Sequence, residues 1–260
     1  MLRVYLTGEL CLATESTVIR AGRMPGRQGR LALAYLVDRR DRPVTRDELA
    51  EVLWAATVPP AHEVALSAII SKLRALLVEA GTGRDALVAE SGCYRLRLPA
   101  DSWVDIEAAI DSIHLAEAAL MSDDPRSAYG PAVVACAILR RPFLPGADHE
   151  WIESRRQTLR ATYLRGLDCL AQIHLWNGEP TLALRAAQEA VDLEPFRESG
   201  YRGLMLLHAR LGNGAQALRV YERLSALLRA ELQTAPGPET RELYESIALQ
   251  DTATKPRRQR

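Results

Sequence analysis

The sequence lacks an excess of either charge, because Lys and Arg together number 33 and Asp and Glu also number 33. Overall charge therefore gives no argument for a polyanionic partner. The sequence also lacks an uncharged apolar run of the roughly 18 residues that a membrane-spanning helix requires. Its start, MLRVYLTGEL, has neither the basic segment nor the long apolar segment of a signal peptide. We expect a cytoplasmic protein that does not enter a membrane.

Motifs for metal binding and catalysis are missing as well. The four cysteines form no CxxC pair, so neither a zinc site nor a redox dithiol is predicted. The five histidines form no HExxH pattern, and the chain contains no GxSxG nucleophile elbow and no GxxxxGK(S/T) phosphate loop. The tryptophans lie at the ends or boundaries of predicted helices, where we expect them to close hydrophobic cores: Trp54, Trp103, Trp151 and Trp176. The sequence predicts no catalytic residue, no metal and no cofactor.

Charge is unevenly distributed along the chain. Residues 1–100 carry 14 basic and 11 acidic side chains, so this part is net positive although the whole chain is neutral. Within residues 18–46 the only acidic side chains are Asp38 and Asp41. The same segment holds eight arginines: Arg20, Arg23, Arg27, Arg30, Arg39, Arg40, Arg42 and Arg46. Such a cluster fits either a phosphate-binding surface or a solvated surface.

The segment Glu63–Val78 has the pattern of an amphipathic helix. Ser67, Ser71 and Arg74 fall on its polar face, and Lys72 flanks that face. Apolar residues at helical spacing form the opposite stripe: Leu66, Ile69, Leu73, Leu76 and Leu77. A turn and two short alternating runs follow over residues 87–98, which predicts a hairpin. A helix followed by a small hairpin is the outline of a winged helix.

The sequence also predicts the elements that precede this helix. Leu2–Leu10 alternates like a strand, and Thr17–Ala21 is its candidate antiparallel partner. Glycines and a proline predict a loop over residues 22–29, and helical spacing predicts a helix over Arg30–Arg40 that Pro43 stops. Thr45, with a glutamate three residues later, predicts the capped start of a helix that runs to about residue 54.

The sequence after residue 104 predicts helices separated by Gly and Pro. They are expected over residues 108–121, 127–139, 149–176, 181–193, 198–211, 215–232 and 239–249. Gly178 and Gly212 are 34 residues apart, as are Ala183 and Ala217, and this is the tetratricopeptide period. We expect a solenoid of about three helix pairs.

Three segments of the N-terminal part carry a resemblance to a known family. They are RDRPVTRDELAEVLW, ALSAIISKLRALL and GCYRLRLP. They are similar to the OmpR/PhoB-type DNA-binding domain of the AfsR/SARP regulators. The resemblance implies that the Glu63 helix lies in the major groove and that the Gly92–Leu96 edge is the wing. The implied DNA contacts are Ser67, Ser71, Lys72, Arg74, Arg46, Tyr94 and Arg95. Tyr94 alternatively belongs to the core of the hairpin.

The helical part resembles the bacterial transcriptional activation domain of the same regulators. The motifs are VDIEAA, RRPFLPG, LEPFRESGYRGLM, ALRVYERLSALLRAEL and PGPETRELYESI. The predicted fold is mainly α with a small β component: a winged helix-turn-helix at residues 1–100 and a tetratricopeptide-like repeat domain at residues 101–250. Residues 251–260 are expected to form a disordered basic tail.

The function implied by both resemblances is sequence-specific regulation of transcription. The protein is expected to bind direct repeats near promoters as an activator, to contact RNA polymerase holoenzyme, and to be a homodimer at least on DNA. Glu63 and the zero net charge motivate an alternative, a protein-interaction adaptor with a weak or non-binding winged helix. Sensing of a small ligand by the repeat domain is the third possibility.

Overall fold

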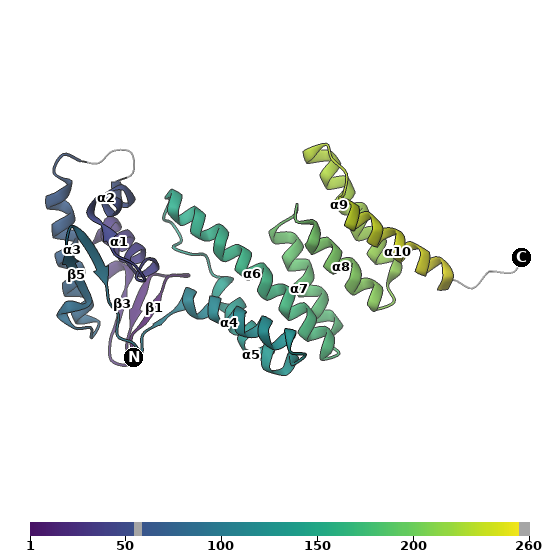
Figure 1. Ribbon diagram of the computed structural model, residues 1–260, viewed down its shortest axis with the longest axis horizontal. Coiled ribbons are helices and arrows are strands. Elements are labelled where there is room, and N and C mark those ends of the chain that lie inside the picture. Colours follow the sequence, from purple (N-terminus) through teal and green to yellow (C-terminus); the bar gives the residue numbers. More distant parts are fainter. Residues whose placement is uncertain (55–58, 255–260) are drawn as a thin grey trace, which may run out of the picture. The chain divides into compact units, whose positions relative to one another are not determined.

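The computed structural model describes residues 1–54 and 59–254 (Figure 1). The chain divides into two compact units. Unit 1 comprises residues 1–111 and 137–162, and unit 2 comprises residues 112–136 and 163–260. This division by packing does not follow the boundary expected at residues 100 and 101, so the division into functional domains stays a prediction.

Unit 1 contains a four-stranded sheet. Its strands are β1 (Arg3–Tyr5), β2 (Cys11–Ala13), β3 (Val18–Arg20) and β7 (Trp103–Val104), in the order β3-β2-β1-β7. The predicted single strand over residues 2–10 is wrong, because the chain turns back at Gly8, whose φ of +71° favours glycine. The predicted partner of β1 is wrong too: β2 lies between β1 and β3, and β3 pairs with β2.

The remaining elements of the first part of unit 1 are three helices and a second sheet. The helices are α1 (Gly26–Asp38), α2 (Arg46–Trp54) and α3 (His62–Glu79), with short 3-10 turns η1 (Ala21–Arg23) and η2 (Arg84–Ala86). The second sheet has the order β4-β6-β5 and consists of β4 (Val44–Thr45), β5 (Leu87–Glu90) and β6 (Cys93–Leu96). The predicted helices and hairpin are therefore present in the predicted order.

The start of α1 corrects the sequence interpretation. The helix begins at Gly26, inside the predicted loop, and ends at Asp38, before Pro43. A Cβ atom on Gly29 would lie 2.7 Å from the Cβ of Pro25. A larger residue at position 29 would clash with Pro25, which explains why a glycine lies within the first turns of the helix and does not mark a loop.

Asp105 connects the first sheet to the helix that follows it. Strand β7 pairs in parallel with β1, and α4 (Asp105–Met121) begins directly after β7. The Asp105 side chain is fully buried. It accepts hydrogen bonds from the backbone N–H of Leu6 at 3.0 Å, from the N–H and hydroxyl of Thr7, each at 2.8 Å, and from the N–H of Ile106 at 2.8 Å. One carboxylate thus caps the helix and binds the end of β1.

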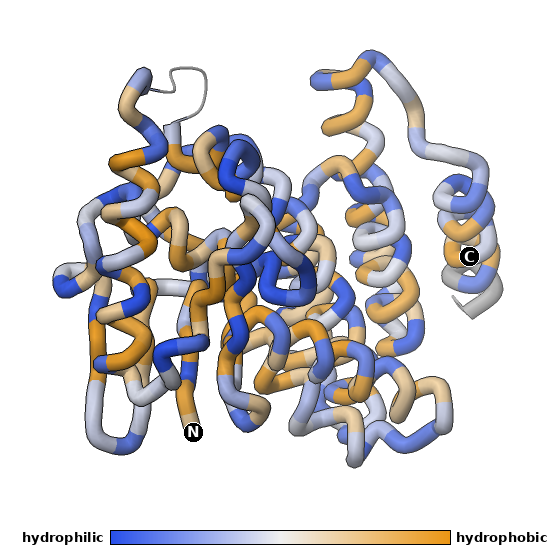
Figure 2. Tube along the Cα trace, turned by 60° about the vertical axis from the view of Figure 1, so that its left-hand side comes forward, coloured by the Kyte–Doolittle hydropathy of each residue, from blue (hydrophilic) through white to orange (hydrophobic). Residues whose placement is uncertain are grey.

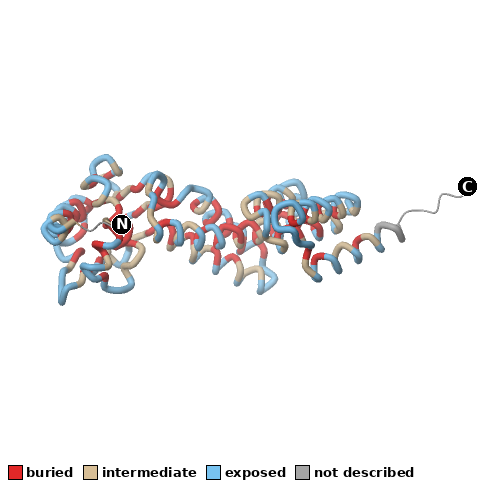
Figure 3. Tube along the Cα trace, turned by 90° about the horizontal axis from the view of Figure 1, so that it is seen from above, coloured by how far each residue is buried: buried red, intermediate tan, exposed pale blue. Residues whose placement is uncertain are grey.

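Helices make up the part of unit 2 that the structure describes, and three of them, α4, α5 and α6, extend into the residues of unit 1. After α4 they are α5 (Pro125–Leu139), α6 (Glu150–Trp176), α7 (Pro180–Leu193), α8 (Glu198–Arg210), α9 (Gly214–Leu232) and α10 (Pro238–Thr254). Along these helices hydrophobic and hydrophilic residues alternate (Figure 2), and buried residues recur at intervals between exposed ones (Figure 3). The mainly helical fold with a small β component is confirmed. Helix α10 includes residues 251–254 of the predicted tail, and residues 255–260 lie outside the described residues.

The repeat positions behave as their spacing predicts. Gly178 and Gly212 have φ values of +75° and +74°, so both turns between paired helices use the left-handed conformation. Ala183 and Ala217 have no exposed surface, which fits the close approach of the paired helices. Trp176 differs from expectation: it is 54% exposed and packs only partly, with the Arg126 guanidinium over its ring.

Candidate nucleic-acid interface

The two faces of helix α3 differ in burial. The predicted apolar stripe and the adjacent Ile70 are buried in the core of unit 1: Leu66, Ile69, Ile70, Leu73, Leu76 and Leu77. Ser67, Ser71 and Lys72 are exposed on the opposite side, and Val64 near the helix start is 74% exposed. Because the core fixes the apolar side, the exposed polar side is presented on a rigid support.

Arg74 occupies a different position from these exposed residues. It is half-buried, and its Nε donates a hydrogen bond of 2.9 Å to the carbonyl oxygen of Leu87 in β5. The side chain therefore joins the helix to the hairpin. Removing it changes the support of the hairpin as well as any ligand contact, so Arg74→Ala is not a neutral test of binding.

The hairpin ends in a tight two-residue turn. Glu90 pairs with Cys93, and the intervening Ser91 and Gly92 have φ values of +49° and +77°. Positive φ at both central positions is characteristic of a type I′ turn, which matches the twist of the strands. The exposed tip is therefore a defined structure, with Arg95 exposed on the strand that follows it.

Tyr94 and Arg46 lie together near the turn of the hairpin, where the Arg46 backbone N–H donates a hydrogen bond of 3.1 Å to the Gly92 carbonyl oxygen. Tyr94 is only 3% exposed and belongs to the core, which agrees with its interpretation as a hairpin anchor. The exposed Arg46 guanidinium lies over the Tyr94 ring, 5.8 Å from its centre. Tyr94 therefore presents little surface to a ligand, whereas Arg46 presents its charge beside the hairpin.

Most arginines of the cluster at residues 18–46 form ion pairs, and the partner of Arg39 is its sequence neighbour Asp38. Five of its eight members have acidic partners: Arg20 with Glu9, Arg23 with Glu79, Arg39 with Asp38, Arg40 with Glu107 and Arg42 with Glu48. Among the residues that the structure describes, Arg27, Arg30 and Arg46 have no ion-pair partner. The free positive charge of this segment is thus concentrated on three side chains.

Glu48 shows how strongly one of these pairs is coupled. Its carboxylate accepts hydrogen bonds from Arg42 at 2.5 and 2.9 Å and from the Tyr35 hydroxyl at 2.5 Å. The Arg42 guanidinium, and to a lesser extent Tyr35, lowers the pKa of Glu48 to about 2. The Glu48 backbone N–H also donates to the Thr45 hydroxyl at 3.1 Å. Thr45 therefore caps α2 as predicted, but the Glu48 side chain does not complete the capping box.

Asp38 is a buried charge that sequence reasoning did not assign. Its side chain is 1% exposed and lies 2.8 Å from Nε of Arg155 in α6, within unit 1. Burial raises its pKa, and the positive charges of Arg155 and Arg39 oppose that shift. No local pattern identifies this pair, because its members are more than a hundred residues apart.

The described residues contain no group of three or more His, Cys, Asp or Glu side chains arranged to hold a metal ion. Within the described residues no disulfide joins any of the four cysteines, Cys11, Cys93, Cys136 and Cys169, and burial raises the pKa of Cys169 to about 11. Within residues 1–54 and 59–254, no helix is long and apolar enough to cross a membrane.

Comparison with known proteins identifies the family. The family described as "Bacterial transcriptional activator domain" matches residues 104–248, more than half of the chain. The chain belongs to this family. The match covers the helical part and begins at β7, one residue before the Asp105 cap. It confirms the resemblance of that part to the activation domain of AfsR/SARP regulators.

Several relatives of this bacterial transcriptional activator domain protein extend the similarity to its N-terminal part. Regulatory protein AfsR of Streptomyces coelicolor is 30% identical over 87% of this chain, which spans only 22% of AfsR. Transcriptional regulatory protein EmbR of Mycobacterium tuberculosis is 28% identical over 94% of this chain and 63% of EmbR. AfsR is named as a regulatory protein and EmbR as a transcriptional regulatory protein.

A solved structure supports the same relationship. Mycobacterium tuberculosis EmbR, in complex with a low affinity phosphopeptide, superposes with a TM-score of 0.87 and 25% identity. The similarity covers 96% of this chain and 65% of that EmbR chain. Nearly all of this chain therefore has the fold of the matching part of EmbR.

Proposed function

We propose that this protein regulates transcription by binding double-stranded promoter DNA in a sequence-specific manner through a winged helix formed by α1–α3 and the β5–β6 hairpin. The observation that carries the proposal is the exposed polar side of α3, with Ser67, Ser71 and Lys72 displayed above a buried apolar stripe. An α-helix presented in this way fits the width of the major groove.

The other basic side chains suit contacts to the sugar–phosphate backbone. Arg46 is exposed beside the turn of the hairpin and Arg95 is exposed on β6, and neither is matched by a carboxylate among the described residues. Phosphate contacts fix the register of a protein on DNA, and base contacts give the sequence preference. Arg74 supports the hairpin through Nε, and its terminal nitrogens supply a further contact at the edge of the interface.

The regulatory role follows from the relatives. We infer that the protein acts as an activator at direct repeats near promoters, that its helical repeats contact RNA polymerase holoenzyme, and that it forms a homodimer at least on DNA. The family match and the names of the relatives support a regulator of transcription.

Fluorescence anisotropy of the whole chain tests the DNA proposal. The probes are duplexes from upstream of its own gene and its neighbours and a scrambled duplex of equal length, each at two salt concentrations. We expect one duplex to bind more tightly than the scrambled sequence and to keep that preference at the higher salt, because base contacts are less salt-dependent than phosphate contacts. Equal binding to all duplexes that disappears with salt would refute sequence specificity.

Variants that change the charge of α3 test whether DNA binds at its exposed side. Ser71→Asp and Lys72→Glu place negative charge on the exposed side of the helix without entering the core. We expect each to weaken the specific complex by about tenfold or more. Arg3→Glu, an exposed position on β1, makes the same change of charge as Lys72→Glu and is the matched control. An equal loss in all three variants would mean that α3 is not the interface.

A protein-interaction adaptor is the second candidate, and a cavity in unit 2 favours it. The cavity has a volume of about 390 Å³ and is lined by α6, α7 and α8, including Leu175, Ala187 and Leu206. Leu206 is 43% exposed. A partner helix inserting an apolar side chain fits such a site. Absence of binding to every duplex, together with a partner whose binding Leu206→Glu abolishes, would establish this role instead.

A further inference from the structure

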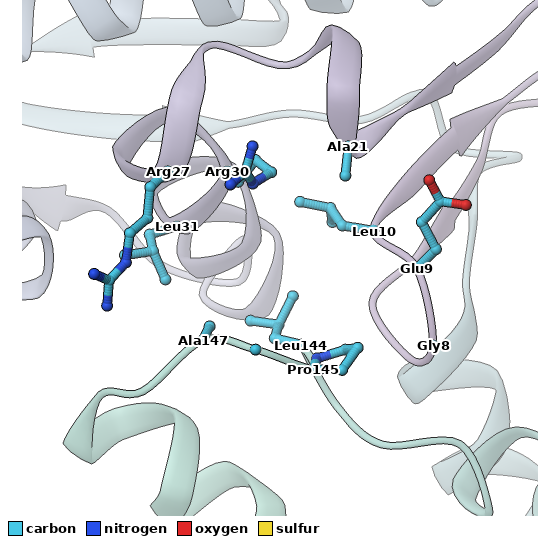
Figure 4. A pocket seen from close by; sticks show the side chains of 11 residues that line it. Gly8, Glu9, Leu10, Ala21, Arg27, Arg30, Leu31, Leu144, Pro145 and Ala147 are labelled. Atoms are coloured by element: carbon cyan, nitrogen blue, oxygen red, sulfur yellow. The ribbon is translucent and has the colours of Figure 1, made fainter.

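Unit 1 contains a cavity whose lining includes no residue of α3. It has a volume of about 400 Å³ and is bounded by the β1–β2 turn, by η1 and α1, and by the loop at residues 144–147 (Figure 4). A volume of this size is within the range of sites that bind small organic molecules. All of its lining residues belong to unit 1.

The base of this cavity is apolar. Leu10, Leu31 and Leu144 line it and are each less than 8% exposed. In Figure 4 the side chains of Leu10 and Leu144 point into the space between the strand end, α1 and the loop. An apolar base of this kind favours an occupant with a hydrocarbon or aromatic body.

The loop at residues 144–147 forms one wall of the cavity and is held by hydrogen bonds within the protein. Leu144 has a φ of +42°, a conformation that costs energy for a residue other than glycine. Arg156 stabilises this segment by donating hydrogen bonds to three backbone carbonyl oxygens: those of Phe143 at 3.0 Å, Leu144 at 2.9 Å and Ala147 at 3.0 Å. The Leu144 N–H also donates to the Leu6 carbonyl at 2.9 Å. The cavity therefore does not depend on a ligand to form its wall.

The charged residues that line the cavity are two arginines and one glutamate. Arg27 and Arg30 line the cavity, and neither has an ion-pair partner in the part of the chain that the structure describes. Glu9 is the acidic residue of the lining, and its carboxylate is 2.6 Å from Nη1 of Arg20. Two free guanidinium groups beside an apolar base are complementary to a ligand that joins an anionic group to an apolar body.

We propose that this cavity binds a small organic anion, with its apolar body on Leu10, Leu31 and Leu144 and its anionic group on Arg27 and Arg30. A carboxylate or sulfonate accepts paired hydrogen bonds from guanidinium groups in this way. The proposal concerns unit 1 alone and does not depend on whether α3 binds DNA.

A pair of fluorescent probes tests the proposal on the whole chain. The first is 8-anilinonaphthalene-1-sulfonate, and the second is N-phenyl-1-naphthylamine, which has the same aromatic body without the sulfonate. We expect the sulfonate probe to bind once per chain and about tenfold more tightly than the neutral probe. We also expect octanoate to displace it at lower concentration than octanol. Equal affinity for the two probes, or equal displacement by acid and alcohol, would overturn the proposal.

Variants locate the binding. Arg27→Gln alters an exposed side chain, and Arg27→Gln combined with Arg30→Gln removes both charges. We expect the single change to weaken the sulfonate probe several-fold and the double change to remove its advantage over the neutral probe. Arg3→Gln, outside the cavity, is the matched control for loss of one charge. Circular dichroism and thermal unfolding establish that each variant is folded. Unchanged sulfonate affinity in both cavity variants would place the probe elsewhere and refute the site.

Discussion

Replacement of Asp105 by alanine tests the account of how β1, β7 and α4 are held together. The change removes the acceptor of four hydrogen bonds, from the N–H groups of Leu6, Thr7 and Ile106 and from the Thr7 hydroxyl. Leu6 and Thr7 are no more than 2% exposed, so water does not replace the lost acceptor. Each buried donor left without a partner costs about 1–3 kcal/mol, and the terms are not additive. We expect the free energy of unfolding to fall by about 3–5 kcal/mol.

Urea unfolding measures this loss. Three of the four tryptophans, Trp54, Trp103 and Trp151, lie in unit 1 and Trp176 lies in unit 2, so fluorescence mainly follows unit 1, and far-ultraviolet circular dichroism follows the helices of both units. Two further variants that remove fewer hydrogen bonds are expected to lower the free energy of unfolding by less. Asp105→Asn keeps the size and one oxygen acceptor and is expected to cost less than alanine, and Thr7→Val removes one donor and is expected to cost about 1 kcal/mol. A loss below about 1 kcal/mol for Asp105→Ala, or equal losses for Asn and Ala, would refute the reasoning.

Two further predictions concern buried and paired charges. Arg155→Met leaves the Asp38 carboxylate, which is 1% exposed, without its nearest cation and is expected to destabilise the protein by about 3–5 kcal/mol at pH 7. Burial already raises the Asp38 pKa, so this cost should shrink as the pH falls and Asp38 is protonated; a cost that stays constant down to pH 4 in thermal unfolding would contradict the assignment. Glu48→Gln removes a carboxylate whose pKa is lowered from 4.5 to about 2. A lowered pKa stabilises the folded state above the unfolded value, so after allowance for solvent screening we expect a loss of about 1–2 kcal/mol at pH 7 that disappears as the pH falls from about 4.5 towards 2. Chemical unfolding of the unchanged protein and of Glu48→Gln between pH 2 and pH 7 measures the difference in the free energy of unfolding. A difference that does not change with pH would refute the role of the Arg42–Glu48 pair.

The helices were predictable from the sequence, because helix formation depends on neighbours three and four residues away. The period of apolar residues and the Gly and Pro boundaries gave α5–α9 nearly to the residue. The repeat spacing likewise identified Gly178, Gly212, Ala183 and Ala217 as turn and packing positions. The buried stripe of α3 follows from the same local rule, so the existence of an exposed polar side was also predictable.

Strand pairing was less predictable, because partners can lie anywhere in the chain. The alternation over residues 2–10 did not reveal the turn at Gly8, which makes β2 the neighbour of both β1 and β3. Nothing near β1 in the sequence indicates that β7, about a hundred residues later, pairs with it in parallel. The cap at Asp105 follows the local rule for a helix start, but its bonds to Leu6 and Thr7 depend on that distant pairing.

The sequence by itself determined the order of the helices, their amphipathic faces and the cluster of arginines in residues 18–46. Only the tertiary structure decided what those arginines do. It brings Glu79 to Arg23 and Glu107 to Arg40, and it leaves Arg27 and Arg30 beside an apolar cavity with no ion-pair partner in residues 1–54 and 59–254. The physical reason is that helix periodicity acts over a few residues, whereas the electrostatic environment of a side chain is set by every charge that folding brings within a few ångströms.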